Sequence, residues 1–350
     1  MKNIILLFVF ASTFMGAVAQ SSEVDNVFVY SLPKTVLFIE VEIEKTTQTP
    51  GSFYQYSERY LATKDVITEA RTFHRLKGIK IWSESFPDIN RTYTTSLNDK
   101  KTAMHNFVIN EKGILCGVNT DYEGTTPTPK QPLLANIQQA TKAEADLLPM
   151  GEDYMMVSSV AKLAEGAAKQ IYRIRDNRLN FLAGDVDNYP ADGDLFLSLM
   201  SQMDKKEKQL TELFSGKTVS ETQTQLIQYD PKSPKTNEIL FRLSALGGLV
   251  SSNDLSGYPY YINITTTSLQ FTQTDQPSKS KSATILRTIQ PASSQIKITD
   301  GKNEYFSGDF DIPQFGPIVS ISNDVLKDGN VKIDIDPQTG RLLSIKSTQK

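Results

Sequence analysis

The sequence of 350 residues contains a single cysteine, Cys116. One thiol cannot form an intramolecular disulfide, so the chain lacks the covalent links that stabilise many small secreted domains. We therefore expect hydrophobic burial to hold the fold, and a chain of this length can form two or three packed units. Cys116 stands between Leu115 and Gly117 in an apolar stretch, which favours a buried thiol over a catalytic one.

Histidine is almost as scarce, because only His74 and His105 are present. A zinc site usually needs three or four ligands, and the spacing of these histidines with Cys116 indicates neither a zinc site nor a thiol–imidazole pair. The sequence also lacks the Gly-x-Ser-x-Gly, His-Glu-x-x-His and glycine-rich phosphate-binding motifs. We predict no catalytic residue and no cofactor, which favours a function other than catalysis and leaves enzyme activity open.

An excess of one charge and long apolar runs are also missing. The formal net charge is -3, and Lys and Arg are scattered without a basic stripe. This distribution gives no electrostatic support to nucleic-acid binding. No segment approaches the roughly 20 apolar residues that a membrane-spanning helix requires, so we expect no transmembrane segment in the mature chain.

The first residues have the pattern of a secretory signal peptide. Lys2 precedes a short apolar run, and the small residues Ala17 and Ala19 occupy the positions that signal peptidase recognises. We predict a signal peptide over residues 1–19, with cleavage between Ala19 and Gln20. Because the residue directly after Ala19 is Gln20 and not a cysteine, the pattern does not predict a lipoprotein, and we expect a soluble periplasmic or secreted protein.

Residues 20–120 mostly show the period-two pattern of β-strands, which predicts an N-terminal β-rich domain. The prolines at 127, 129 and 132 then indicate an exposed connection over residues 121–150. The elements expected in the first domain are a strand over 35–45, a short helix over 54–62, a strand over 72–83 with a bulge at Gly78, and a β-hairpin over 104–118.

Residues 151–216 change to the period of helices and predict a helical hairpin. The first helix is expected over about 158–182, and the second from Asp192 or Asp194 to a cap at Gly216. The expected apolar seams are Val160, Ala164, Ala167, Ile171 and Ile174 on the first helix, and Leu195, Leu199, Met203, Leu210 and Leu213 on the second.

The period returns to two over residues 217–350, which predicts a C-terminal β-rich domain. The predicted fold class is α+β, with two sandwich-like or barrel-like β-rich units and the helical hairpin between them. The strands expected in this domain lie over 219–229, 238–246, 258–267, 281–289, 296–298, 317–322, 331–335 and 342–345.

Four stretches of the chain resemble a family of exported proteins from gut bacteria of the Bacteroidetes group, known only as a domain of unknown function. The resemblance covers nearly the whole mature chain, implies export and a shared architecture, and transfers no catalytic residue. The four stretches are Tyr30 to Thr35, Tyr54 to Leu61, the helical pair with Ile174 to Arg178 and Leu210 to Lys217, and Asp336 to Gly340.

The densest group of carboxylates lies between the two predicted helices. Asp185, Asp187, Asp192 and Asp194 could supply oxygen ligands to calcium, which takes six to eight of them. The EF-hand pattern is absent, and aspartates beside a helix start also cap the helix and complement its dipole. We favour the capping interpretation and keep these four residues as candidate metal ligands.

Three further clusters have an ordinary structural interpretation beside a functional one. Acids on one strand face usually mark its solvated side, although paired carboxylates can hydrolyse glycosides. Basic residues usually form the wet face of an amphipathic helix, although they could hold an anion. The clusters are Glu40, Glu42 and Glu44; Lys169, Arg173, Arg175 and Arg178; and the Tyr258, Pro259, Tyr260 and Tyr261 group, which could stack on a sugar ring.

The leading hypothesis is an exported, non-catalytic envelope or secreted protein that binds a protein or a glycan. One alternative is a carboxylate-based hydrolase of envelope or dietary glycans. A second alternative is a calcium-stabilised structural module.

Overall fold

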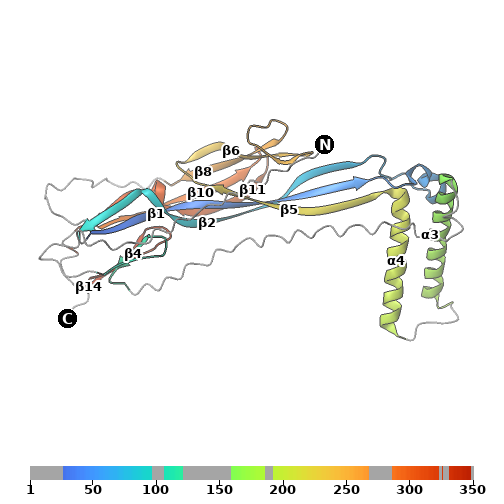
Figure 1. Cartoon of the computed structure of the whole chain (residues 1–350), viewed down its shortest axis with the longest axis horizontal. Coiled ribbons are helices and arrows are strands. Elements are labelled where there is room, and N and C mark those ends of the chain that lie inside the picture. The colour runs from blue at the N-terminus through green and yellow to red at the C-terminus, as the bar shows by residue number, and fades with distance from the viewer. Residues whose placement is uncertain are drawn as a thin grey trace, which may run out of the picture.

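The computed structural model describes residues 27–96, 106–120, 159–185, 192–267, 286–322, 325 and 331–347. Within these residues the chain has an α+β fold in which strands predominate and the sheets are antiparallel. The molecule is long and narrow, with sheets along most of its length and a helical hairpin at one end (Figure 1). The predicted β-rich α+β class is confirmed, whereas its sandwich-like or barrel-like units stay a prediction.

A three-stranded antiparallel sheet, which we call the ribbon, runs along most of the molecule (Figure 1). Its central strand is β1 (Val27–Thr49), which lies between β2 (Arg71–Ser96) and β5 (Lys217–Tyr229). The strands expected in these three regions are confirmed. β1 and β2 are longer than the sequence pattern indicated, because each continues through a proline at a register shift, Pro33 opposite Pro87.

A second register shift lies at the predicted bulge. Glu42 pairs with Gly78 and Ile43 pairs with Leu76, so Lys77 has no partner opposite it on β1. An extra residue on one strand increases the local twist of an antiparallel pair. The glycine signal in the sequence therefore located this bulge correctly.

A five-stranded sheet packs against one face of the ribbon. Leu37, Ile39, Val41 and Ile43 alternate along β1 and are buried against this sheet, which confirms the alternation expected for β1. The strand order is β11-β10-β8-β6-β7. The elements are β6 (Lys235–Ser244), β7 (Gly248–Val250), β8 (Tyr258–Thr266), β10 (Ala292–Thr299) and β11 (Glu304–Ile312), followed by the 3-10 turn η2 (Pro313–Phe315).

The end of the molecule opposite the hairpin has two smaller sheets and its own core, which includes Tyr30, Leu32 and Ile333. Strands from both predicted β-rich regions share sheets there and in the ribbon, and the domain limits at 120 and 217 stay a prediction. The strands are β3 (Phe107–Ile109), β4 (Leu115–Val118), β13 (Val331–Ile335) and β14 (Leu342–Ser347) in one sheet, and β9 (Leu286–Ile289) and β12 (Ile318–Ile321) in the other.

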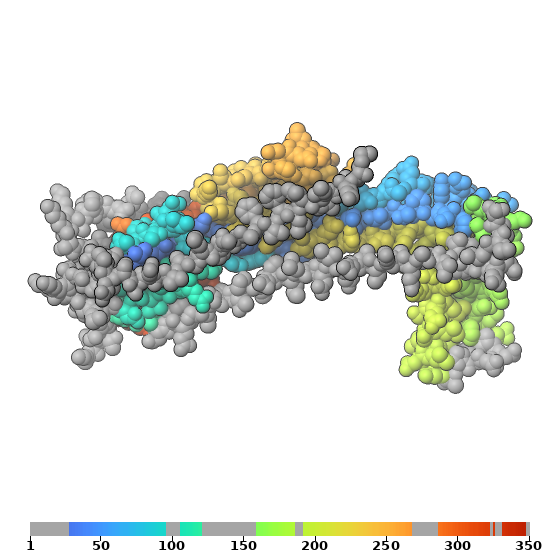
Figure 2. Space-filling view, in the orientation of Figure 1, coloured from blue at the N-terminus to red at the C-terminus, as the bar shows by residue number. Residues whose placement is uncertain are grey.

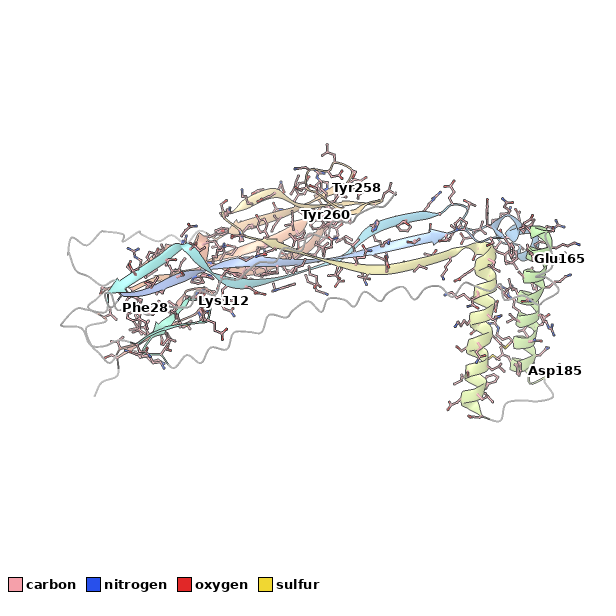
Figure 3. The ribbon with its side chains drawn as sticks, in the orientation of Figure 1. Phe28, Lys112, Glu165, Asp185, Tyr258 and Tyr260 are labelled. Atoms are coloured by element: carbon pink, nitrogen blue, oxygen red, sulfur yellow. The ribbon has the colours of Figure 1, made fainter. Side chains whose placement is uncertain are left out.

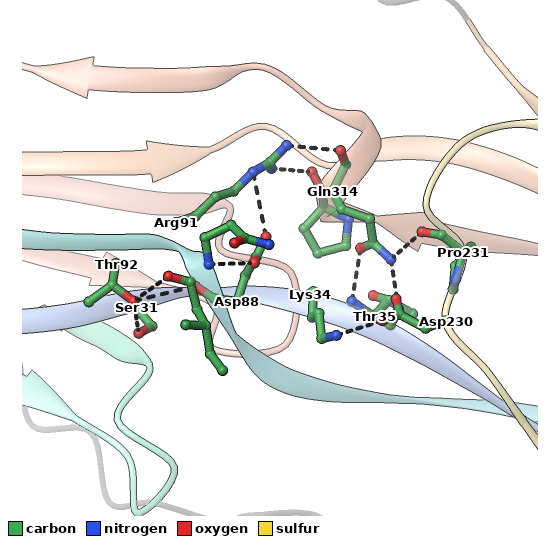
Figure 4. Close-up of polar contacts among 12 residues, drawn as sticks. Ser31, Lys34, Thr35, Asp88, Arg91, Thr92, Asp230, Pro231 and Gln314 are labelled. Carbon is green, nitrogen blue, oxygen red and sulfur yellow. Dashed lines mark hydrogen bonds and ion pairs between the residues drawn. The ribbon is translucent and has the colours of Figure 1, made fainter.

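A group of polar contacts fastens the ribbon to the turn after β11 (Figure 4). The Gln314 side chain accepts from the Thr35 backbone N–H at 2.9 Å and donates to the carbonyls of Thr35 at 2.7 Å and Pro231 at 3.1 Å. Arg91 of β2 donates to the carbonyls of Pro313 and Gln314. These bonds satisfy backbone groups of β1, of the segment after β5 and of η2, and they tie the ribbon to η2.

The predicted helical hairpin is confirmed. A short turn and helix at the end of β1, η1 (Tyr54–Tyr56) and α1 (Ser57–Leu61), pack beside it, where the sequence predicted a helix. The long helices are α3 (Val160–Ala183) and α4 (Gly193–Ser215), and they lie side by side across the end of the ribbon (Figure 1). None of the helices in the described part of the chain is long and apolar enough to cross a membrane.

Tyr30, which lies in the core opposite the hairpin, should make the protein less stable at alkaline pH. Burial raises the pKa of Tyr30 to about 12, although its hydroxyl accepts from the Arg287 backbone N–H at 2.8 Å. Unfolded Tyr30 ionises near pH 10, so its contribution to stability, about 3 kcal/mol, is complete below pH 10 and disappears as pH rises towards 12. Tyr30→Phe should therefore show a smaller loss of unfolding free energy over this range in denaturant titrations.

Tyr258→Phe is the matched control, because the Tyr258 side chain is 77% exposed. Burial also raises the pKa of Tyr229 and of Tyr260, so part of the alkaline loss should persist in every variant. Equal slopes for Tyr30→Phe and the wild type between pH 10 and 12 would contradict this account.

Candidate functional site

The last turn of α4 is joined to the ribbon by backbone hydrogen bonds. The Phe53 N–H donates to the Leu213 carbonyl at 2.7 Å, and the Ile67 N–H donates to the Ser215 carbonyl at 2.8 Å. The final carbonyls of a helix have no partner within the helix, so these two donors satisfy groups that would otherwise be free. The hairpin is thereby fixed to the segments that follow β1 and precede β2.

Two glycines permit this close approach. A Cβ atom on Gly51 would lie 2.2 Å from the Leu213 carbonyl oxygen, so only glycine fits there. Gly216 has a φ of +86° and lies against Thr49 and Ile67. The cap predicted at Gly216 is confirmed, and it also marks the point where the chain turns from α4 into β5.

The apolar core of the hairpin occupies only the half near the ribbon. Ala164, Ala167 and Ile171 of α3 are buried against Leu210 and Phe214 of α4. The small alanine side chains allow the two helices to approach closely, as the seam in the sequence indicated. No fully buried residue follows Ile171 on α3 or precedes Leu210 on α4 in the described residues.

Ion pairs replace the apolar seam in the middle of the hairpin. Arg175 donates to Glu207 at 2.7 Å, and Arg178 binds both Glu207 and Asp204. Lys169 pairs with Glu165 along α3 at 2.7 Å. Three members of the basic cluster noted in the sequence therefore bind carboxylates of the hairpin itself, which leaves little support for an anion site.

Four leucines are exposed in the half of the hairpin far from the ribbon. Leu179 and Leu182 of α3 and Leu195 and Leu197 of α4 have between 59% and 66% of their surfaces exposed. Leu182 follows Ile171 by about three turns on the same face of α3, yet Ile171 is fully buried. The two helices therefore leave these four leucines uncovered, although Phe181, Phe196 and Leu199 in the same half are partly buried.

This part of the hairpin carries acids and no bases. Asp185, Asp192 and Asp194 lie among the leucines, whereas no Lys or Arg occurs over 179–185 or 192–203. Asp185 marks the free end of the hairpin in Figure 3, far from the sheets. Figure 2 shows the hairpin projecting to one side of the ribbon. We call the described residues 179–185 and 192–199 the hairpin end.

The structure describes three of the four candidate metal ligands. The Asp192 carboxylate accepts from the Asp194 backbone N–H at 3.0 Å and caps α4, and Asp194 lies in the first turn. Asp185 is exposed after α3, and Asp187 lies outside the described residues. No group of three or more metal-binding side chains occurs in the described part of the chain. Calcium binding by these residues stays a prediction.

A substitution at Asp192 can distinguish a helix cap from a calcium ligand. Asp192→Ala should destabilise the first turn of α4 by about 1 kcal/mol, because an orphan N–H loses its acceptor. Amide exchange in that turn should therefore be faster in the variant, equally in calcium and in chelator. Asp185→Ala is the control that leaves the cap in place. A chelator effect in the wild type that disappears in Asp192→Ala would favour the metal site.

The rare residues are not brought together in the described structure. Cys116 is buried in β4, and burial raises the pKa of its thiol to about 11, which disfavours the nucleophilic thiolate. The His74 ring lies near the carbonyl of Ala245 in the turn between β6 and β7, and His105 lies outside the described residues.

The three glutamates of β1 form a ladder of ion pairs with β2. Lys80 binds Glu40 at 3.2 Å and also Glu42, and Arg75 binds Glu44. The carboxylates lie on the ribbon face opposite the buried Val41 and Ile43, where alternation places them. This arrangement agrees with the interpretation of a solvated face, and hydrolysis by these carboxylates stays without support.

The aromatic group of β8 does not form a platform. Tyr260 is buried and packs against Phe241 with ring centroids 4.7 Å apart, whereas Tyr258 is 77% exposed (Figure 3). On the ribbon, Phe38 packs against Trp82 with centroids 5.8 Å apart, and Lys112 lies over Phe86. Phe38, Trp82 and Phe86 are partly buried, which favours a packing role for these rings.

Two open hollows flank the base of the hairpin. One, of 360 Å³, lies between α1 and α3. There the Tyr60 hydroxyl donates to the Ala161 carbonyl at 3.4 Å and the Tyr172 hydroxyl to the Tyr60 carbonyl at 2.9 Å. The other, of 590 Å³, lies beside Gln48 and Gly216. Both tyrosine hydroxyls are bonded within the protein. Arg59, Glu165 and Lys169 also line the first hollow, and Glu165 and Lys169 pair with each other.

Sequence reasoning did not identify the exposed leucines as a site. Leu195 was expected in the apolar seam of α4 and Val160 in that of α3, but both are at least half exposed, a correction to the two ends of the seams. Periodicity shows which face a residue occupies and not where the facing helix stops covering it. The available signal was the surplus of leucines at Leu179, Leu182 and Leu197, outside the assigned seams.

Comparison with known proteins places the chain in one family. A family model described as a domain of unknown function, DUF4831, matches residues 26–343. Neither the curated proteins nor the solved structures gave a match to this chain. The match spans both ends of the ribbon and the hairpin, and the chain therefore belongs to the DUF4831 family.

Proposed function

We propose that this protein is an exported, non-catalytic binding protein whose hairpin end binds another protein. The observation that carries the proposal is the group of four exposed leucines at Leu179, Leu182, Leu195 and Leu197. Single exposed leucines are ordinary on protein surfaces, but four at one end of a hairpin, with Leu179 and Leu182 three residues apart on one face of α3, favour an interaction site.

The energy available from this patch is adequate for association. Full burial of one leucine contributes about 2 kcal/mol, so several leucines covered by a partner can offset a substantial part of the cost of association. The hairpin itself cannot supply this burial, since α3 and α4 leave Leu182 two-thirds exposed on the face that buries Ile171. A surface from another molecule would bury these leucines.

A protein is a better partner than a glycan for this surface. Leucine side chains offer no hydrogen-bond partners, and a sugar hydroxyl placed against them would lose its bonds to water without replacement. A protein can instead present a complementary apolar groove, as when a helix lies in a hydrophobic groove. The ribbon supports this role because it holds the hairpin end away from the other sheets (Figure 1).

Cross-linking in the protein's own cells tests the proposal. A photo-reactive amino acid in place of Leu182 should give a discrete adduct with one protein after illumination. The same substitution at Leu255, which is 83% exposed on a loop of the five-stranded sheet, is the matched control and should give none. Adding Leu179→Glu and Leu195→Glu should remove the adduct, because two charges replace the apolar contact.

Circular dichroism on the purified variants checks that the helices remain folded. Equal adducts from positions 182 and 255, adducts with many unrelated proteins, or adducts that survive the leucine substitutions would each overturn the proposal. A glycan adduct from position 182 would show that the ligand of the hairpin end is a glycan and not a protein.

Export is part of the proposal and rests on residues 1–19. Mass spectrometry of the protein from the periplasmic or culture fraction should find a mature N-terminus at Gln20. Ala19→Arg should leave the signal peptide uncleaved, because signal peptidase requires a small residue there. A cytosolic protein that retains Met1 would contradict export. The proposed protein binding would then be tested by the cross-links alone.

A further inference from the structure

We propose that the hairpin end binds an apolar protein surface rimmed with Lys or Arg. This inference rests on the proposed function and adds the chemistry of the partner. The feature that supports it is that the hairpin end combines exposed leucines with charged side chains that are all acidic.

The acids of the hairpin end lack basic partners within the described residues. The nearest base along α3 is Arg178, which binds Asp204 and Glu207 of α4. No ion pair joins Asp185 or Asp194 to a Lys or Arg in the described part of the chain. The sequence between the helices adds Asp187 and no base.

Covering the leucines would also bring these carboxylates close to the partner. A carboxylate that loses water without gaining a counter-ion is costly, so a neutral or acidic rim on the partner would oppose docking. Lys or Arg at the rim would pair with the acids and steer the approach of the two surfaces. The same acids disfavour an anionic membrane surface, whose lipids would repel them.

A pair of synthetic peptides provides a defined probe. One is an amphipathic helix with leucine on one face and lysine on the other, and its twin has glutamate at each lysine position. The full-length protein should bind the lysine peptide at least about tenfold more tightly than the glutamate peptide in fluorescence anisotropy. Raising NaCl from about 0.1 M to about 1 M should weaken binding of the lysine peptide more than binding of the glutamate peptide, because the Debye length falls from about 10 Å to about 3 Å.

Charge variants locate this preference on the hairpin end. Asp185→Lys combined with Asp194→Lys should reduce or reverse the preference between the peptides. Asp65→Lys combined with Asp309→Lys makes the same change in net charge at exposed positions away from the hairpin end and should preserve the preference. Leu179→Glu with Leu195→Glu should abolish binding of the lysine peptide, whereas Leu246→Glu with Leu255→Glu should not.

The outcomes separate this inference from the proposed function. Equal binding of the two peptides, or equal effects of the two charge-reversal pairs, would overturn the inference that the partner has a basic rim. Binding to phosphatidylglycerol vesicles through the same leucines would assign the surface to a membrane and overturn the inference. If the cross-link at position 182 depends on the leucines while the peptides are not distinguished, the protein partner stands and only its rim chemistry is wrong.

Discussion

The pairing of β1 with both β2 and β5 is the interaction on which the rest of this structure depends. One long strand, Val27–Thr49, supplies buried residues both to the core that it shares with the five-stranded sheet and to the core at the end opposite the hairpin. Its alternating residues satisfy two requirements at once, because Val41 and Ile43 are buried while Glu42 and Glu44 bind basic residues of β2. The chain therefore needs no disulfide to maintain an extended shape.

The position of the hairpin follows from the end of that strand. β1 leads to the segment that donates hydrogen bonds to the last turn of α4, and α4 turns directly into β5, which returns along β1. Gly51 and Gly216 permit the close approach at this junction. The rigid attachment at one end contrasts with the hairpin end, where no fully buried residue joins the helices in the described residues and the leucines remain exposed.

Much of the fold could be predicted from short-range patterns. Alternation located most strands, and the change of period located the hairpin, because these signals depend on neighbours along the chain. β11 was missed because Gly308 and two aspartates interrupt the alternation of Glu304–Ile312. The hairpin end was missed for a different reason. The periodicity that buries Ile171 continues through Leu182, and only the limits of the α3–α4 core determine that the first is covered and the second exposed.

The sequence by itself determined the β-rich α+β class, the two long helices, the cap at Gly216 and dependence on burial in a chain with one cysteine. Each follows from local geometry or from composition. Only the tertiary structure decided that β1 and β5, nearly two hundred residues apart, lie side by side, and that Glu40, Glu42 and Glu44 meet bases. It also decided that leucines and acids share one exposed end. These are long-range relations, and they depend on strand register and on where packing stops, which no local pattern encodes.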